Sequence, residues 1–253
     1  MTTSRLFARE KGGGDKVVVF LHGFVDTHVA WHDIQDAIAL EASTLAFDLP
    51  GYGKSVDYPD PARPKAVVEA LLQELNQRQL GPVHLVGHSR GGAIAVLVAL
   101  AAPDLVTSMT LLAPGGFGTE INHRLLSRYA EAVTATELKS IMENMYGWNN
   151  PVTDDTVRHM VEMRQVEGQR EKLIEIAKHL HRDGKQGVIP REQLASLYMP
   201  VKILWGTQDR VLPTRQAHRL PPMFAAHIFE DTGHMLPAEI PDDVVALIKQ
   251  NLR

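Results

Sequence analysis

The hydrophobic residues of this chain form short continuous runs, separated by segments in which apolar positions recur at helical spacing. Continuous runs rich in β-branched side chains are typical of strands buried on both faces of a parallel sheet. We expect such strands at residues 17–21, 43–47, 83–86, 108–113, 201–205 and 226–229. Helices are expected over residues 64–78 and 90–101, with a closing helix at 241–252. The alternation predicts an α/β fold whose sheet is mostly parallel and flanked by helices on both faces.

Two turns are predicted from clusters of glycine and proline. Residues 12–15, Gly-Gly-Gly-Asp, lie between residues 5–9 and the strand at 17–21, and we expect them to close a hairpin that pairs these two segments. Residues 48–53, Asp-Leu-Pro-Gly-Tyr-Gly, superficially resemble a phosphate-binding loop but lack its Gly-Lys-Ser/Thr ending in the required register. We interpret them as a surface turn.

Residues 118–196 interrupt the alternation of strands and helices. Four helical stretches follow one another there, near residues 120–133, 135–146, 153–167 and 169–182. Ligands bind at the carboxyl ends of parallel strands, so an all-helical insertion after one strand is expected to form a cap over that edge. We therefore divide the chain into an α/β core, residues 1–117 and 197–253, and a helical cap, residues 118–196.

Several methionines of this insertion have the spacing of a helical stripe, namely Met142, Met145, Met160 and Met163. A stripe of this kind is typical of packing within a helical layer. The alternative, which the sequence leaves open, is that Met142 and Met145 line a substrate pocket.

Composition narrows the class of protein. With 253 residues, 44% hydrophobic and 22% charged, the chain has the composition of a globular protein with a large core. A net charge of −4 provides no electrostatic argument for nucleic acid or an anionic membrane as a partner. The absence of cysteine excludes disulfides and a thiolate nucleophile. The N-terminal residues lack the apolar core of a signal peptide, and no stretch reaches transmembrane length, so we expect a cytoplasmic protein.

The candidate nucleophile is Ser89, at the centre of Gly87-His88-Ser89-Arg90-Gly91. This segment follows an expected strand and precedes an expected helix, and so sharp a turn forces its central residue into strained backbone angles. The flanking positions need glycine because larger side chains would collide there. The turn exposes the serine oxygen at a helix N-terminus, where backbone N–H groups bind anions.

A serine hydroxyl becomes a nucleophile when a base removes its proton and a third group holds the base in place. His234, in a loop after a late strand, is the best candidate for the base among the 12 histidines. Asp209, just past the strand that ends at residue 205, is the candidate for the third group. Asp231 competes for this role, although a position three residues before the histidine makes contact with the far ring nitrogen awkward.

Acyl transfer also needs two hydrogen-bond donors for the oxyanion of the tetrahedral intermediate. We assign these to the backbone N–H of Arg90, directly after the nucleophile, and to the N–H of Phe24, in the loop after the first buried parallel strand. His22 is interpreted as a structural hydrogen-bonding residue. No cofactor is expected and no metal site, because the four-residue spacing of His28 and His32 comes without further ligands of known position.

Together these motifs resemble the α/β-hydrolase superfamily over nearly the whole chain. The matching segments are His22-Gly23, residues 48–55, residues 87–92, residues 206–209 and Gly233-His234. Residues 112–122 also resemble the hydrolase-like half of acetoin dehydrogenase E2 subunits, and the pattern as a whole resembles small capped esterases. The 253 residues have no room for a lipoyl domain, so we expect no lipoamide-linked acyl transfer. The resemblance implies an α/β-hydrolase fold with Ser89, Asp209 and His234 as a catalytic triad in the family's chain order.

Arg90 departs from the Met, Leu or Gln that family members often place after the nucleophile. Two interpretations remain open. Arg90 forms a structural ion pair, or it faces the pocket, binds substrate there and favours one that carries a carboxylate.

The sequence predicts a serine hydrolase that cleaves a small carboxylic ester, thioester or lactone through an acyl-enzyme. Carbon–carbon bond hydrolysis and cofactor-free perhydrolysis are alternatives that the same residues support. A serine rather than an aspartate at position 89 argues against dehalogenase and epoxide hydrolase chemistry. A ligand-sensing signalling protein that retains the triad is an alternative of another class, since a fold alone does not define a function. We expect a small-molecule acyl substrate as partner, and an apolar cap surface would also allow a homodimer.

Overall fold

The computed structural model describes residues 5–218 and 220–252. Residues 1–4, which belong to the N-terminal stretch considered for a signal peptide, lie outside the described residues, as do residues 219 and 253. Within the described part of the chain, no helix is long and apolar enough to cross a membrane.

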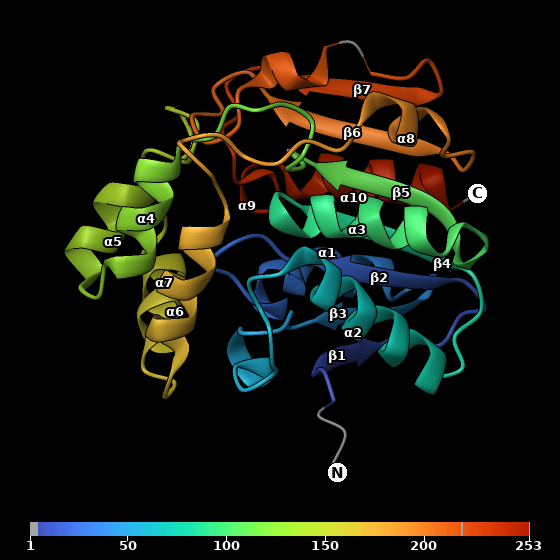
Figure 1. Cartoon of the computed structure of the whole chain (residues 1–253), viewed down its shortest axis with the longest axis horizontal. Coiled ribbons are helices and arrows are strands. Elements are labelled where there is room, and N and C mark those ends of the chain that lie inside the picture. The colour runs from blue at the N-terminus through green and yellow to red at the C-terminus, as the bar shows by residue number, and fades with distance from the viewer. Residues whose placement is uncertain (1–4, 219, 253) are drawn as a thin grey trace.

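In the residues that the structure describes, seven strands form one sheet with the order β1-β3-β2-β4-β5-β6-β7 (Figure 1). The strands are β1 (Ala8–Lys11), β2 (Val17–Leu21), β3 (Ser43–Phe47), β4 (Val83–His88), β5 (Val106–Leu112), β6 (Val201–Gly206) and β7 (Phe224–Phe229). All neighbouring pairs from β3 to β7 are parallel. The mostly parallel sheet predicted from the hydrophobic runs is confirmed.

The hairpin expected near the N-terminus is wrong. β1 pairs antiparallel with β3, in a register that runs from Ala8 opposite Phe47 to Lys11 opposite Thr44. Both edges of β2 are already occupied by its parallel neighbours β3 and β4. The outer edge of β3 is the free one, so β1 adds there, and residues 12–15 connect two strands that are not neighbours.

Helices cover both faces of the sheet. α2 (Pro64–Gln77) packs beside α3 (Arg90–Ala101) on one face, and α1 (His32–Ile38) packs beside α10 (Pro241–Asn251) on the other (Figure 1). The short helix α9 (Leu236–Glu239) precedes α10. α1 is not among the predicted helices, because a helix of 7 residues shows little periodicity.

The helices predicted for residues 118–196 lie between β5 and β6. They are α4 (His123–Glu131), α5 (Ala135–Met142), α6 (Asp154–Arg164) and α7 (Gln169–His179), followed by the short α8 (Arg191–Ala195). Side chains of Asn122, Thr134 and Thr153 cap the first three by accepting hydrogen bonds from backbone N–H groups of the first turn. Figure 1 shows α4 to α7 grouped beyond the arrowheads of β5, β6 and β7, at the carboxyl edge of the sheet.

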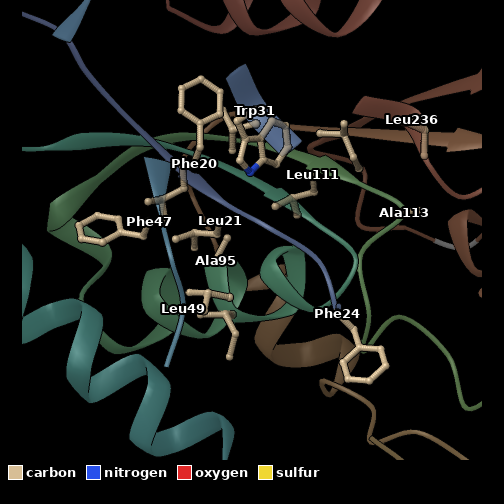
Figure 2. Close-up of a cluster of buried hydrophobic side chains, with 14 of the residues drawn as sticks. Phe20, Leu21, Phe24, Trp31, Phe47, Leu49, Ala95, Leu111, Ala113 and Leu236 are labelled. Carbon is tan, nitrogen blue, oxygen red and sulfur yellow. The ribbon is translucent and has the colours of Figure 1, made fainter. Parts of the chain in front are cut away.

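Large apolar side chains fill the space between the sheet and its helices (Figure 2). Phe20, Phe47 and Trp31 are fully buried, and the rings of Phe20 and Trp31 lie 5.2 Å apart. Burial of such side chains stabilises the fold by about 1.5–3 kcal/mol each. The resulting rigid sheet fixes the positions of the residues that follow its strands, among them Ser89 and Asp209.

Residues 48–53 form a turn, but this turn is buried and not on the surface. Asp48 is fully buried, and its carboxylate accepts a hydrogen bond from the N–H of His28 at 2.7 Å. From α7, the side-chain amide of Gln169 donates to the carbonyl of Gly51 at 2.8 Å. The helical segment therefore covers the turn, a long-range contact that a pattern of proline and glycine does not encode.

Candidate active site

Ser89 occupies the turn between β4 and α3. Its φ of 51° and ψ of −113° lie in a region that residues with a side chain rarely adopt. The N–H of Ser89 donates to the carbonyl of Leu112 at 2.8 Å, and its carbonyl accepts from the N–H of Gly115 at 2.9 Å. The end of β5 and the loop after it thus hold the serine in the strained conformation expected for this turn.

The glycines two positions before and after Ser89 are required because backbones approach closely there. A Cβ on Gly87 would lie 2.6 Å from the carbonyl oxygen of Gly91. A Cβ on Gly91 would lie 2.2 Å from the carbonyl oxygen of Leu21 in β2. The steric reason predicted for these two glycines is confirmed.

The structure brings Ser89, His234 and Asp209 into one chain of hydrogen bonds. The Oγ of Ser89 lies 3.0 Å from Nε2 of His234, and Nδ1 of His234 lies 2.7 Å from Oδ2 of Asp209. All three residues are buried, and each follows the carboxyl end of a strand. A carboxylate beside Nδ1 favours the tautomer with its proton on that nitrogen, which leaves Nε2 to accept a proton from the serine.

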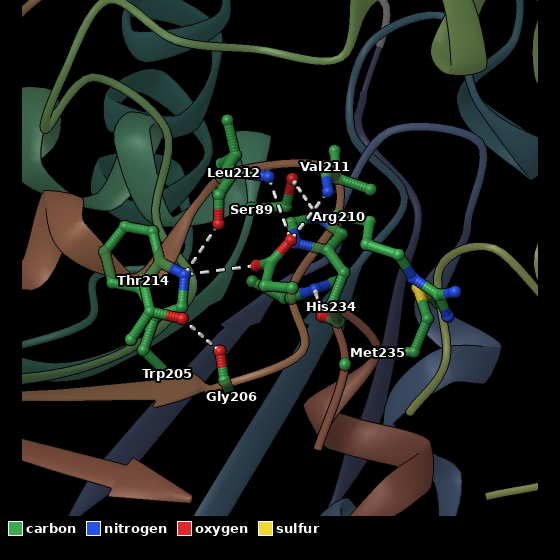
Figure 3. Close-up of polar contacts among 12 residues, drawn as sticks. Ser89, Trp205, Gly206, Arg210, Val211, Leu212, Thr214, His234 and Met235 are labelled. Carbon is green, nitrogen blue, oxygen red and sulfur yellow. Dashed lines mark hydrogen bonds and ion pairs between the residues drawn. The ribbon is translucent and has the colours of Figure 1, made fainter. Parts of the chain in front are cut away.

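Every hydrogen-bond partner of the Asp209 carboxylate among the described residues is a donor. Figure 3 labels the residues that carry these donors, Trp205, Val211, Leu212 and His234. Oδ1 accepts from the backbone N–H groups of Val211 and Leu212, both at 2.8 Å. Oδ2 accepts from Nε1 of Trp205 at 3.1 Å in addition to the bond from His234. Two rigid backbone donors and one indole therefore hold this carboxylate in a single orientation toward the imidazole.

Asp231, the competing candidate, lies apart from the imidazole. Its side chain is exposed and accepts a hydrogen bond from Nε2 of Gln208 at 2.8 Å. The structure thus brings Asp209, and not Asp231, into contact with His234.

His88, directly before Ser89, holds the backbone of His234. Its Nε2 donates to the carbonyl of His234 at 2.8 Å, and the two imidazole rings lie 5.0 Å apart. Burial lowers the pKa of His88 to about 3, and the nearby His234 acts in the same direction. His88 is therefore neutral near pH 7. Its Nδ1 lies beside Gly23, where a Cβ would approach to 2.8 Å.

Glu239, at the end of α9, ties the loop around His234 to the helical segment. Its Oε2 accepts from the N–H groups of Gly147 (2.7 Å) and Gly233 (2.9 Å). The same oxygen accepts from Nδ2 of Asn150 at 2.9 Å, and Oε1 accepts from the N–H of Met235 at 2.9 Å. One carboxylate thus connects residues 147–150 with both neighbours of His234.

Two backbone N–H groups beside Ser89 have no acceptor among the residues described. They belong to Phe24 and to Arg90, the first residue of α3. The loop that carries Phe24 runs close to the nucleophile, since a Cβ on Gly23 would lie 3.4 Å from the Cβ of Ser89. Both residues predicted as oxyanion donors therefore lie next to Ser89 with an unpaired N–H.

His22 has the structural position predicted for it. Its Nε2 accepts from the N–H of Leu49 at 3.0 Å. Burial lowers the pKa of His22 to about 4, so the ring is neutral and holds the buried 48–53 turn against the end of β2.

A largely apolar cavity of about 330 Å³ lies beside Ser89. The core contributes Phe24 and one face of α3, with Ala93, Ile94 and Leu97. The helical segment contributes residues 186–189 together with the end of α7. The cavity therefore lies between the core and the helical segment, at the nucleophile.

Neither Met142 nor Met145 is among the residues that line this cavity. Met145 is buried, and its backbone carbonyl accepts the N–H of His234 at 2.6 Å. Met142 is also buried and lines a separate cavity that includes Asp26 and His159. Substrate contacts of these two methionines therefore stay a prediction, and such contacts would lie outside the cavity at Ser89.

Neither His88 nor Glu239 is predicted from the sequence as a functional residue. The signal for His88 is its place inside the nucleophile motif. Glu239 has a weaker signal, because its partners at residues 147–150 are far away in the chain.

The parallel sheet, its flanking helices and the serine at the strand-to-helix turn define the class of α/β hydrolases. The chain belongs to the alpha/beta hydrolase family, whose sequence profile matches residues 18–247. The resemblance stated from the motifs is thereby confirmed, and the relatives support a hydrolase.

One relative is the dihydrolipoyllysine-residue acetyltransferase component of the acetoin cleaving system of Cupriavidus necator. It is 30% identical over 242 residues, and the match covers 96% of this chain but only 65% of the relative. A second is the 2-hydroxy-6-oxononadienedioate/2-hydroxy-6-oxononatrienedioate hydrolase of Cupriavidus pinatubonensis, 27% identical over 252 residues, which covers 92% of this chain and 85% of the relative. Among solved structures, a meta-cleavage product hydrolase from Pseudomonas fluorescens matches with a TM-score of 0.86 at 18% identity, covering 98% of this chain and 93% of that one.

Proposed function

We propose that this protein is a serine hydrolase that cleaves a small carboxylic ester, thioester or lactone through an acyl-enzyme. The observation that carries the proposal is the buried chain of hydrogen bonds from the Ser89 hydroxyl through His234 to Asp209. A hydroxyl within 3.0 Å of an imidazole nitrogen, itself oriented by a carboxylate, has the arrangement of an activated nucleophile.

In the first half-reaction, the Oγ of Ser89 attacks the carbonyl carbon while Nε2 of His234 takes the hydroxyl proton. The carbonyl π electrons move onto oxygen. When they return, the bond to the leaving group breaks, and His234 donates its proton to the departing alcohol or thiol. Water then attacks the acyl-enzyme with the same proton transfers, which releases the carboxylic acid and restores Ser89. Asp209 stabilises the imidazolium formed in each half.

The unpaired N–H groups of Phe24 and Arg90 serve as the oxyanion hole in this mechanism. They are backbone donors held by a rigid loop and a helix N-terminus, so they need no reorganisation as charge develops on oxygen. Loss of one such donor typically lowers kcat by about 10²–10³-fold.

Residues 118–196 act as a cap in this proposal, since residues 186–189 and the end of α7 close one side of the cavity. A volume of about 330 Å³ is near the lower limit for small-molecule sites, which typically measure about 300–1,000 Å³. This size and the apolar lining support a short acyl group as substrate.

A fluorophosphonate probe tests the proposal directly, because it phosphonylates activated serines. We expect labelling of the wild type, loss of labelling in Ser89→Ala, and unchanged labelling in Ser196→Ala, a control at an exposed serine. Multiple turnovers on p-nitrophenyl esters of short acids would identify an enzyme. A wild type that is not labelled, or that stops after one turnover, would contradict the proposal, and the second outcome would favour a ligand-sensing protein.

Carbon–carbon bond hydrolysis is a second candidate. It is favoured by the relative named as a hydrolase of 2-hydroxy-6-oxononadienedioate, which matches 92% of this chain. A dienoate of this kind, tested beside the ester panel, separates the two reactions. A kcat/KM on the dienoate well above that on every ester would assign the site to carbon–carbon bond cleavage.

A further inference from the structure

Arg90, whose side chain is a buried cation, is one of the residues that line the cavity beside Ser89. The residue is 8% exposed and lines the cavity. Its Nη2 donates to the carbonyl of Pro61, and its guanidinium lies over the ring of Tyr52, 5.7 Å from the ring centroid. The other terminal nitrogen, Nη1, is buried and has no hydrogen-bond partner in the described part of the chain.

Among the described residues, no carboxylate forms an ion pair with this guanidinium. Pro61 offers a neutral carbonyl, and burial raises the pKa of Tyr52 to about 12, so its phenol is also neutral near pH 7. Across residues 5–218 and 220–252, Arg90 takes part in no ion pair, and no aspartate or glutamate lines the cavity. The structural ion pair considered for Arg90 is therefore absent from the described residues. A buried charge without an anionic partner is unfavourable, and an anion in the cavity would offset that cost.

Basic residues lie close in the chain to residues that line the cavity. Residues 179 and 180 and residues 186–189 line it, and the stretch 178–185 between and beside them carries Lys178, Arg182 and Lys185 against one acid, Asp183. Glu120, in a β-bridge with Lys185, adds a second acid nearby. The side chains of the stretch 178–185 are mostly exposed. Cations near a site raise the local concentration of anionic ligands and their rate of association.

We propose that Arg90 binds a carboxylate of the substrate, so that the substrate carries an ionised carboxyl group in addition to the carbonyl that Ser89 attacks. This inference rests on the proposed function and deepens it by naming the substrate class. A guanidinium matches a carboxylate through paired N–H donors, and the bond to Pro61 fixes the orientation of the group while Nη1 remains unpaired. Ala93, Ile94 and Leu97 share a face of α3 with Arg90, and a methylene chain between the two functional groups would pack on that face.

The test compares esters of matched length with and without the carboxylate. Mono-p-nitrophenyl glutarate carries it on the acyl side, and p-nitrophenyl pentanoate is its neutral equivalent. The butyrate ester of p-hydroxybenzoate carries it on the leaving group, and the butyrate ester of p-hydroxybenzamide is its neutral equivalent. We expect the wild type to prefer one charged ester over its neutral equivalent by about 10- to 100-fold in kcat/KM, the range of hydrogen bonds to a charged group. Which charged ester is preferred shows on which side of the scissile bond the carboxylate lies.

Arg90→Met should abolish this preference, and Arg90→Lys should retain part of it. The readout is the ratio of kcat/KM values for charged and neutral esters, because every variant keeps the backbone N–H of residue 90. Lys65→Met is a matched control at an exposed cation on α2 and should leave the ratio unchanged. A wild type that hydrolyses charged and neutral esters equally well overturns the inference while the proposed function stands.

Binding to Ser89→Ala provides a readout that does not depend on turnover. Calorimetric titration should show monomethyl glutarate, which keeps one free carboxylate, binding about 10-fold or more tighter than its neutral equivalent methyl pentanoate, with the difference lost in Ser89→Ala/Arg90→Met. If no ester is cleaved but monomethyl glutarate binds selectively, the proposed function fails and the carboxylate site remains. If monomethyl glutarate binds no tighter than methyl pentanoate, the inference fails whatever the ester activity.

Discussion

Asp209→Asn removes one charge and turns one of two carboxylate oxygens into an N–H donor, in a site where every neighbour is a donor. The amide oxygen can occupy only one of the two positions. If it faces Val211 and Leu212, it keeps both backbone bonds of 2.8 Å, and its NH₂ then points at Nδ1 of His234 and Nε1 of Trp205. The backbone cannot move away, whereas an imidazole changes tautomer readily. We therefore expect this orientation.

The consequence for His234 is the wrong tautomer. Nδ1 would accept from the amide, the proton would move to Nε2, and Nε2 would no longer accept the proton of Ser89. His234 would lose the tautomer with its proton on Nδ1, and its imidazolium would lose the negative charge that stabilises it. In serine hydrolases this lowers kcat by about 10⁴-fold, or about 5 kcal/mol of transition-state stabilisation. The unfolding free energy should fall by only about 1–3 kcal/mol, because Trp205 loses one of the two acceptors of its indole N–H.

The assay measures kcat on a p-nitrophenyl ester, the rate of fluorophosphonate labelling, and unfolding in urea. Asp231→Asn is the matched control, since it makes the same chemical change 22 residues further along the chain, at an exposed side chain that contacts Gln208. It should retain kcat within about twofold. The reasoning is refuted if Asp209→Asn lowers kcat by less than about tenfold, or if Asp231→Asn lowers it as much.

Three further predictions follow from the surroundings of the site. Gly23→Ala would place a Cβ 2.8 Å from Nδ1 of His88 and displace the N–H of Phe24, so kcat should fall by about 10²–10³-fold. Gly13→Ala, which meets no atom within 4 Å, is its control, and equal losses in both variants would contradict the steric argument. Glu239→Gln should cost about 1–3 kcal/mol of unfolding free energy in urea, since its amide must face at least one backbone donor, whereas Glu230→Gln at an exposed position should cost little. Asp26 is buried, and burial raises its pKa from 3.8 to about 7. Ionisation of Asp26 therefore lowers the unfolding free energy by its full amount above about pH 7 and has no effect on it below about pH 4. Asp26→Asn should therefore raise the unfolding free energy at pH 8 by on the order of 2–4 kcal/mol and leave it nearly unchanged near pH 4; an equal effect at both pH values would show that ionisation is not the cause.

Much of the core fold could be predicted because parallel strands buried on both faces leave a local signal. β2 and β3 have the bounds predicted for them, and so does α3, which starts directly after the nucleophile. The pairing of β1 could not be predicted, because it depends on which strand edge is free once the sheet has formed. The buried position of the 48–53 turn likewise depends on α7, more than a hundred residues further along the chain.

In the active site too, some features follow from residues that are neighbours in the chain, and others depend on segments far apart in the chain. Ser89 and its flanking glycines are recognisable because steric constraints of one short turn determine the residue types. The places of Asp209 and His234 after strands predict their roles, and the structure brings both to Ser89. The spacing of Met142 and Met145 could not reveal which way their side chains point, because that depends on how the helices pack. The sequence also could not predict that the buried guanidinium of Arg90 has an unpaired nitrogen, because this depends on which groups pack around it in the folded protein.

The hydrogen bonds around Glu239 also make the position of His234, the general base, depend on the folding of the segments beside it. Gly147, Gly233 and Met235 donate to a single carboxylate, and the N–H of His234 donates to Met145 in the helical segment. We therefore expect residues 145–150 and 233–239 to open as one cooperative unit, with amide hydrogens that exchange with solvent at similar free energies. While this unit is open, His234 is not held at Ser89. Each 1.4 kcal/mol of its opening free energy thus changes the fraction of inactive molecules about tenfold, even when the rest of the protein stays folded.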